Sequence, residues 1–224
     1  GFITEQTACV VMETIQGEAG ILTPDNGYLQ AVRKRCTETG TLLILDEIQC
    51  GFARTGSLWA FTDYQITPDV LILGKALGGG MPLGAFISSA ALMSTLSHTP
   101  VLGHISTFGG HPVCCAAGLA ALEVLLEEKL SEQVAAKSQL FRQLLQHPAI
   151  KNTRGKGLLL ALEFDSFEQN KRIIDGCISD GIITDWFLHN SNSMRIAPPL
   201  IITEEEIKKA CEVILKNIER FGSN

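Results

Sequence analysis

The sequence predicts an α/β fold with a mostly parallel sheet, followed by a small α+β lobe. Two apolar runs, TLLILDE (41–47) and DVLILGK (69–75), have the length and the β-branched content of fully buried strands. Segments with helical periodicity alternate with such runs, which is typical of a parallel sheet with covering helices. From about residue 149 the expected order becomes β-α-β-α, so we expect two domains, 1–148 and 149–224.

The expected elements rest on apolar runs for strands and on a period of about 3.6 residues for helices. Gly40 is expected to close the first helix, and Thr203 with Glu206 forms a capping box for the last. In chain order we expect a strand at 7–15, a helix near 28–39, strands at 41–48, 70–73 and 84–89, helices at 113–129 and 131–146, a strand at 157–164, a helix at 167–180, a strand at 182–188 and a helix ending near residue 221.

Composition excludes several classes of partner. The 224-residue chain has 46% hydrophobic residues and a net charge of −6, without a basic stripe, which argues against nucleic-acid or acidic-membrane binding. No apolar run reaches the ~18 residues that a membrane-spanning helix needs. Seven cysteines without a C-x-x-C pair suit reduced thiols in a cytoplasm. The five histidines lack metal-site spacing, so we expect no metal.

Two chemically useful residues follow the two buried strands. Asp46 and Lys75 each come where an apolar run ends, and the carboxyl edge of an open α/β sheet is where ligands bind. A carboxylate beside a heterocyclic nitrogen and an amine able to form an imine are what pyridoxal phosphate (PLP) requires of its protein. Glycines and the apolar strand should leave Lys75 partly buried. Glu47 points to the opposite face, so we expect it to be structural.

Six sequence blocks carry a resemblance to a known family. The chain resembles the class III PLP-dependent aminotransferases, the ornithine, acetylornithine and 4-aminobutyrate group. The resemblance implies the large domain of the PLP-dependent transferase fold (fold type I), in part, plus a small C-terminal domain. The blocks are VVMETIQGEAG (10–20), LILDEIQCGFARTG (43–56), PDVLILGKALGGGMPLGA (68–85) and STFGGHPVCCAA (106–117), with weaker support from RGKGLLLALEF (154–164) and MRIAPPL (194–200).

The resemblance implies roles around the cofactor. Lys75 matches the lysine that forms the Schiff base with PLP and then moves the proton of the substrate. Asp46 matches the acid that holds the protonated pyridine nitrogen, and Gln49 the glutamine that contacts the phenolic oxygen. Glu13 matches a glutamate near the ring. Thr107 matches a threonine that reaches the phosphate bound by the partner subunit, which implies a homodimer with shared active sites.

The resemblance also implies which residues contact one end of the substrate. Arg195 matches the arginine that receives a substrate carboxylate, and Glu18 the glutamate that pairs with it when the substrate presents an amine. The sequence departs from the family pattern at three positions. Thr14 stands where proline is usual, Ile105 where glycine is commoner, and His111 where asparagine is commoner.

The expected activity is transfer of an amino group from an ω-amino donor resembling acetylornithine or ornithine to 2-oxoglutarate, in a ping-pong cycle. The partners are then an amine donor and a 2-oxo acid acceptor. Family members are about twice this length, and their first half supplies a turn for the cofactor phosphate and a ring that stacks on the pyridine. We therefore expect this chain to be a fragment that is inactive alone.

Three other interpretations stay open. The run TLLILDE also fits a Walker B strand, although the G-x-x-x-x-G-K-[ST] loop that must accompany it is absent. Another class III PLP enzyme, such as an aminomutase, racemase or decarboxylase, would share most of the residues around the cofactor. A non-catalytic fragment is the third.

Overall fold

A computed structural model describes residues 2–101 and 104–222, and the chain divides into two compact units. Unit 1 comprises Gly1–Thr14, Pro24–Phe52 and Trp59–Glu128, and unit 2 comprises Ile15–Thr23, Ala53–Leu58 and Lys129–Asn224. The division into domains at 148/149 stays a prediction.

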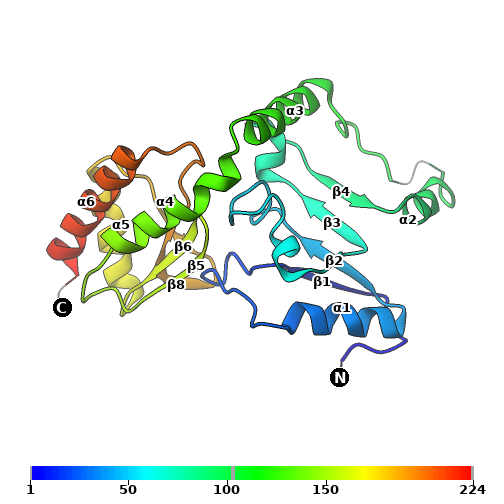
Figure 1. The fold of residues 1–224 in the computed structure, drawn as a ribbon, viewed down its shortest axis with the longest axis horizontal. Coiled ribbons are helices and arrows are strands. Elements are labelled where there is room, and N and C mark those ends of the chain that lie inside the picture. Colours follow the sequence, from blue (N-terminus) through cyan, green and yellow to red (C-terminus); the bar gives the residue numbers. More distant parts are fainter. Residues whose placement is uncertain (1, 102–103, 223–224) are drawn as a thin grey trace. The chain divides into compact units, whose positions relative to one another are not determined.

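Unit 1 contains a four-stranded sheet in which three neighbouring strands are parallel and the last is antiparallel (Figure 1). The expected α/β fold with a mostly parallel sheet is thus confirmed for this unit. The strands, in their order across the sheet, are β1 (Cys9–Glu13), β2 (Leu42–Asp46), β3 (Val70–Leu73) and β4 (Ala85–Ser88).

Helix α1 (Tyr28–Thr39) connects β1 to β2 and has the bounds that its sequence predicts. It buries Leu29 and Cys36 in a cluster with Leu43 and Leu45, which alternate along β2 and therefore face the same side of the sheet. Gly40 ends the helix in the left-handed region at φ 70°, where a residue without a Cβ is favoured.

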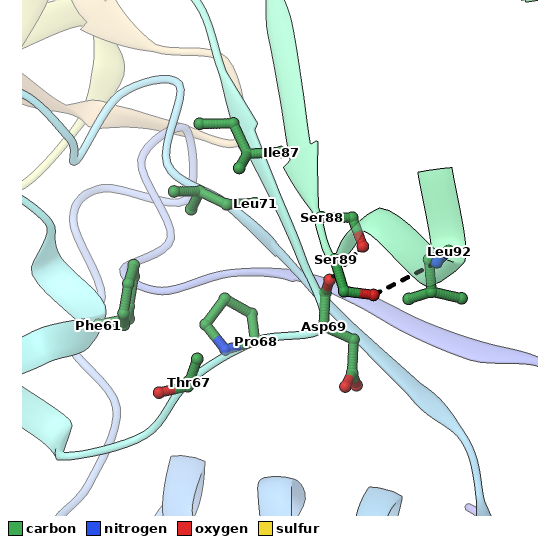
Figure 2. A pocket seen from close by; sticks show the side chains of 9 residues that line it. All are labelled: Phe61, Thr67, Pro68, Asp69, Leu71, Ile87, Ser88, Ser89 and Leu92. Atoms are coloured by element: carbon green, nitrogen blue, oxygen red, sulfur yellow. Dashed lines mark hydrogen bonds between the residues drawn. The ribbon is translucent and has the colours of Figure 1, made fainter. Parts of the chain in front are cut away.

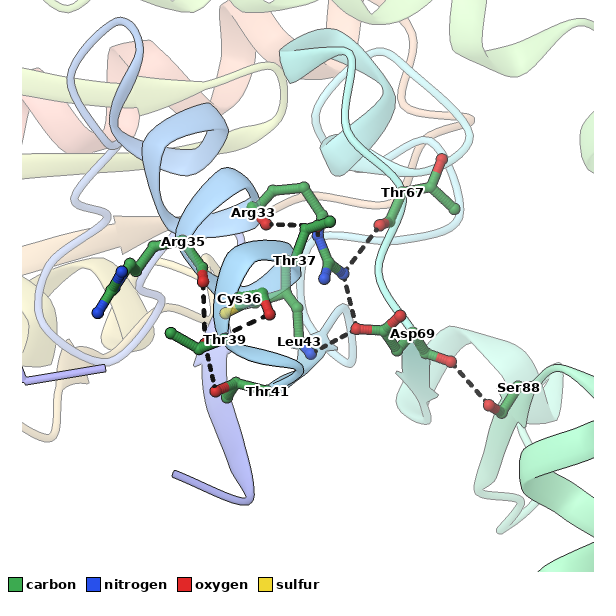
Figure 3. Close-up of polar contacts among 10 residues, drawn as sticks. All are labelled: Arg33, Arg35, Cys36, Thr37, Thr39, Thr41, Leu43, Thr67, Asp69 and Ser88. Carbon is green, nitrogen blue, oxygen red and sulfur yellow. Dashed lines mark hydrogen bonds and ion pairs between the residues drawn. The ribbon is translucent and has the colours of Figure 1, made fainter. Parts of the chain in front are cut away.

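Asp69 joins the starting ends of the strands to α1 (Figure 3). Its Oδ2 accepts hydrogen bonds from Arg33 Nη1 and from the Leu43 backbone N–H, both at 2.7 Å. Its carbonyl oxygen accepts a hydrogen bond from Ser88 Oγ, also at 2.7 Å. The residue that precedes β3 thus contacts α1, β2 and β4, which helps to set the relative register of the strands.

The segment after β3 packs closely against a helix. An added Cβ at Gly79 would collide with the Ala117 carbonyl oxygen, and one at Gly118 with the Leu77 carbonyl oxygen. Glycine at these two positions lets the turn and the helix approach each other. The remaining helices of unit 1 are the 3-10 helices η1 (Ala60–Tyr64), η2 (Lys75–Gly78) and η3 (Thr95–Ser97) and the α-helices α2 (Ala90–Ser94) and α3 (Pro112–Glu127).

Unit 2 contains an antiparallel sheet and three helices around one apolar cluster that includes Phe141, Leu160, Met194 and Ile214. The sheet order is β5-β6-β8-β7. The elements are α4 (Leu130–Leu144), β5 (Asn152–Lys156), β6 (Leu159–Glu163), α5 (Phe167–Ser179), β7 (Trp186–Phe187), β8 (Asn190–Ile196) and α6 (Glu204–Phe221).

The expected strand at 182–188 is wrong in extent, because only Trp186 and Phe187 are in a strand. Strands β5 and β8 are additional to the expected β-α-β-α order. They read NTRGK and NSNSMRI, so neither has the apolar run that identifies a strand in the sequence. The capping box of α6 is confirmed, since Thr203 Oγ1 accepts from the Glu206 N–H at 3.2 Å and Glu206 Oε2 from the Thr203 N–H at 2.8 Å.

All seven cysteines are free thiols. In the part of the chain that the structure describes, no helix combines the length and apolar character that crossing a membrane would require. The described residues also contain no cluster of three or more side chains suited to a metal ion.

Glu47 is a fully buried carboxylate at the end of β2. Its Oε1 accepts hydrogen bonds from Thr14 Oγ1 at 2.7 Å and from the Phe61 N–H at 2.8 Å, and its Oε2 accepts one from the Ala60 N–H at 2.8 Å. These bonds compensate part of the cost of burying the charge. They connect β1, β2 and η1, which confirms the expected structural role. Threonine at position 14 supplies a donor that proline lacks.

Burial raises the pKa of Glu47 above its ordinary value of 4.5, and its three hydrogen bonds oppose that rise only in part. We therefore expect Glu47→Gln to lower the free energy of unfolding by about 1–3 kcal/mol, because the amide N–H₂ would face a backbone donor. A group with a raised folded-state pKa stabilises most at a pH below its unfolded pKa. The advantage of the wild type over this variant should thus shrink as pH rises above 4.5.

Urea unfolding between pH 4 and 7 measures both effects. The matched control is Glu38→Gln, which removes a half-exposed carboxylate on α1 and should change the free energy of unfolding by less than about 0.5 kcal/mol. A wild-type advantage that grows with pH, or equal effects of the two substitutions, would contradict the assignment.

Candidate active site

Asp46 and Lys75 follow neighbouring parallel strands to the same edge of the sheet in unit 1. Asp46 is the last residue of β2 and lies opposite Ile72 of β3. Lys75 comes three residues after Ile72, where β3 has ended and η2 begins. Parallel strands end at one edge, so the register brings the acid-bearing and the amine-bearing segments together.

The two segments are in close contact beyond the strand ends. A Cβ at Gly74 would lie 3.3 Å from Ile48 Cγ2, so the residue before Lys75 packs directly on the residue two positions after Asp46. The Ile48 N–H also donates a hydrogen bond of 2.8 Å to Asp46 Oδ1. One oxygen of the half-buried carboxylate is therefore held by the chain that packs beside the lysine segment.

Lys75 is exposed in this structure, so the expectation that it is partly buried is wrong for this chain. Its backbone lies in the left-handed region at φ 46°, which is uncommon for a residue with a Cβ. The turn that follows is closed by a hydrogen bond of 2.9 Å from the Leu77 N–H to the Gly74 carbonyl oxygen. Such backbone strain is frequent at functional positions, where the surrounding structure holds it.

Two other expected cofactor residues lie at the same edge. Glu13 is the last residue of β1 and is the direct register partner of Asp46. Gln49 lies in the turn after β2, and both side chains are half-buried. The structure thus brings Glu13, Asp46, Gln49 and Lys75 to the ends of three adjacent strands, as the parallel sheet requires. Their contacts with a cofactor stay predictions.

Thr107 lies in an exposed turn that precedes α3. Backbone hydrogen bonds from Gly109 to Ser106 and from His111 to Phe108, at 3.3 and 3.2 Å, shape this turn. A hydroxyl before a helix N-terminus is suited to an anion. The role of Thr107 at a partner subunit's phosphate stays a prediction.

In unit 2, Arg195 and Glu18 form the expected pair although 177 positions separate them. Arg195 lies in β8 opposite Ala161 of β6, and its Nη2 is 3.0 Å from both Oε1 and Oε2 of Glu18. Their side chains are 19% and 30% exposed. The arginine and the glutamate are therefore together, as their expected roles at one end of a substrate require.

Glu18 is held in place by the chain between β7 and β8. The Leu188 N–H donates to Glu18 Oε2 and the His189 N–H to the Glu18 carbonyl oxygen, both at 3.0 Å. Arg154 Nε donates to the carbonyl oxygen of Gly20, where the backbone has φ 90°. These bonds fix the 15–23 segment to the sheet of unit 2 and thereby set the position of the Glu18 carboxylate.

A second acid, which the sequence does not predict, lies beside Arg195. Asp185 Oδ1 lies 3.1 Å from Arg195 Nε, and the ring centroid of Phe187 lies 4.7 Å from the guanidinium carbon. Asp185 has no informative spacing from Arg195 in the sequence, because β7 meets β8 through an irregular register. Arg195 is thus contacted by two carboxylates and one aromatic ring.

A hollow of about 390 Å³ in unit 1 lies elsewhere (Figure 2). It is lined by residues at the start of β3, at the end of β4 and in the adjoining segments, including Pro68, Asp69 and Ser89. Since β4 is antiparallel to β3, these segments lie at the edge opposite Asp46 and Lys75. The Asp69 carboxylate is already bonded to Arg33 and Leu43, so we do not assign this hollow to the candidate site.

Comparison with known proteins identifies the family of this chain. The model of the family "Aminotransferase class-III" matches residues 2–218. The ornithine aminotransferase of Toxoplasma gondii superposes with a TM-score of 0.88 and 38% identity, over 97% of this chain and 52% of that chain. It was crystallised with partial occupancy of PLP at its active site.

Two further solved structures are similar to this chain to a comparable degree. The acetylornithine aminotransferase of Elizabethkingia anophelis has a TM-score of 0.85 and 39% identity, over 96% of this chain and 54% of that chain. For the ornithine δ-aminotransferase of Plasmodium falciparum the values are 0.85 and 35%, over 97% and 57%. This chain therefore spans about half the length of these proteins. The extent of the family match and the level of identity show that the chain belongs to the class III aminotransferases, a family of PLP-dependent transaminases.

Proposed function

We propose that this chain provides part of the active site of an aminotransferase that moves an amino group from an ω-amino donor, such as acetylornithine or ornithine, to 2-oxoglutarate by a ping-pong cycle. One observation carries the proposal: Asp46 and Lys75 follow adjacent parallel strands to one edge, where Gly74 and Ile48 are in contact. The structural likeness to ornithine and acetylornithine aminotransferases supports this donor class.

The residues at this edge fit pyridoxal phosphate. The fit rests on the acid with one oxygen held by Ile48, on Lys75 in the adjacent segment, and on Glu13 and Gln49 at the neighbouring chain ends. Asp46, Gln49, Lys75 and Glu13 would hold the group, and Thr107 would reach the phosphate of the group bound by the partner subunit. When bound, PLP supplies an electron sink for the carbanion that forms at the substrate's Cα.

Asp46 would accept the N–H of the cofactor's ring nitrogen and so help the ring to act as the sink. The Ile48 N–H fixes Oδ1, which leaves Oδ2 of the carboxylate available as an acceptor. A preorganised acceptor of this kind costs little reorganisation during the reaction. Glu47, on the opposite face, anchors the strand end that carries Asp46.

The amine of Lys75 would attach the cofactor and would move the proton at the substrate's Cα. The second task requires the amine to stay within reach of the substrate's Cα. The short turn from Gly74 to Leu77 and the close packing of Gly79 on α3 hold the lysine backbone while the side chain moves.

Arg195 and Glu18 would handle the far end of the substrate. The planar guanidinium suits a carboxylate, as 2-oxoglutarate presents, whereas Glu18 neutralises the arginine when the donor presents an amine. The 3.0 Å pair corresponds to the second of these states. The contact favours transamination with two different substrates over the other class III reactions.

We propose that the chain is inactive alone and that the complete protein is a homodimer in which Thr107 reaches the partner's phosphate. Two observations support the first part. The chain spans about half the length of its structural relatives. The sheet face that carries Asp46 also carries Val11 and Phe86, which are 60% and 48% exposed, whereas α1 covers the other face.

The assignment of Lys75 is tested by Lys75→Ala in the complete protein. Borohydride reduction followed by peptide mass measurement should find the cofactor on the Lys75 peptide in the wild type and not in the variant. Turnover should fall by a factor of about 10²–10⁴ or more, because the proton-transfer group is lost. Lys34→Ala removes an exposed lysine of α1 and should change neither readout. Turnover of Lys75→Ala near the wild-type rate would refute the proposal.

The assignment of Arg195 is tested by Arg195→Ala. KM for 2-oxoglutarate should rise roughly ten- to 100-fold, since a charged hydrogen bond contributes about 1.5–3 kcal/mol, while PLP occupancy stays near that of the wild type. Arg195→Lys should give an intermediate value because it keeps the charge without the planar fork. Arg172→Ala, on the exposed face of α5, is the neutral control. An equal loss of PLP occupancy would contradict the role.

A further inference from the structure

We propose that Asp185 is a specificity-determining residue that biases the Arg195 end of the substrate site toward donors with a second ammonium group and against dicarboxylates. The inference rests on the proposed function, because it takes Arg195 as the group that meets the far end of the substrate. It assigns to Asp185 a role distinct from that of Glu18.

Asp185 and Glu18 contact Arg195 at different atoms. Asp185 Oδ1 is 3.1 Å from Arg195 Nε, whereas Glu18 is paired with Nη2, so the two acids contact different nitrogens of one guanidinium. The backbones are also connected, since the Arg195 N–H donates to the Asp185 carbonyl oxygen at 2.9 Å and Thr184 Oγ1 to the Arg195 carbonyl oxygen at 2.6 Å. The position of Asp185 beside Arg195 is therefore built into the strand pairing.

The two acids outnumber the one guanidinium that they contact. Glu18, Asp185 and Arg195 together carry two negative charges and one positive charge, so the group is net negative while both acids are ionised. An incoming carboxylate must compete with two carboxylates for one guanidinium. An incoming ammonium instead meets an acid that Arg195 does not fully neutralise. The cluster thus attracts cationic donor ends and resists a second substrate carboxylate.

Asp185 differs from Glu18 in its exposure and in the geometry of its contact with Arg195. The Asp185 side chain is 61% exposed, against 30% for Glu18, so it is the more accessible acid of the two. Arg195 Nε makes no hydrogen bond of good geometry within the described residues, although Asp185 lies at 3.1 Å. The Asp185–Arg195 contact is therefore mainly Coulombic, and the acid can turn toward a ligand without breaking an aligned bond.

A matched pair of donors isolates this effect. The compounds 1,4-diaminobutane and 4-aminobutyrate both contain four carbons and the same reacting amine, and they differ at the far end, which is an ammonium group in the first and a carboxylate in the second. In the complete protein, Asp185→Asn should lower the ratio of kcat/KM for the diamine to kcat/KM for the aminobutyrate by about fivefold, which is the scale of exposed charge pairs acting on two ligands of opposite sign. The change should appear in KM, and it should diminish as salt is added.

The matched control is Asp165→Asn, which removes an ion pair of 3.1 Å with Lys151 in the same unit and at comparable exposure. It should leave the donor ratio unchanged. A second readout, independent of turnover, is calorimetric titration of the complete protein with glutarate, a dicarboxylate without a reactive carbonyl. Asp185→Asn should bind glutarate about threefold more tightly than the wild type, because one competing carboxylate is gone.

The outcomes separate the two proposals. Transamination with an unchanged donor ratio and unchanged glutarate affinity in Asp185→Asn would overturn the role of Asp185 and leave the proposed function intact. The same shift in Asp165→Asn would also overturn it, since the effect would then come from overall charge. Failure of the complete protein to transfer an amino group to any 2-oxo acid would overturn the proposed function, and the inference with it.

Discussion

The parallel pairing of β2 with β3 is the constraint on which the candidate site depends. Because Asp46 lies opposite Ile72, the chain that leaves β3 reaches Lys75 within three residues, at the edge where β2 also ends. A slip of one residue would turn Asp46 to the other face of the sheet. Leu43 and Leu45, which pack against α1 from that other face, make such a slip costly, so the apolar cluster under α1 also fixes the direction of the acid.

Two neighbouring acids at the end of β2 therefore have different environments. Asp46 is half-buried with one oxygen held by a backbone N–H, whereas Glu47 is fully buried and accepts three hydrogen bonds. Alternation along the strand places one toward the candidate site and the other toward η1. Glu47 holds the end of the strand in position through its hydrogen bonds. Asp46 can therefore contact a ligand without also having to hold the strand end.

The sequence is most informative where one interaction dominates. Apolar runs predict β2 and β3 and with them the common edge of Asp46 and Lys75, and the turn before residue 28 together with Gly40 predicts α1. Strands β5 and β8 are polar outside their buried positions, so their pairing with β6 is what makes them strands. The exposure of Lys75 depends on which surfaces surround it, and a local pattern does not carry that information.

The surroundings of Arg195 show that a family motif alone does not describe a whole binding site. The block MRIAPPL predicts Arg195 and its resemblance predicts Glu18, yet the charge that a ligand meets is set by every acid within reach of the guanidinium. The irregular pairing of β7 with β8 places Asp185 beside Arg195, and no spacing in the sequence predicts that pairing. An arginine with one acid is a neutral pair, whereas an arginine with two acids is a net negative group. The chemistry expected of Arg195 therefore depends on a residue that lies outside the motif.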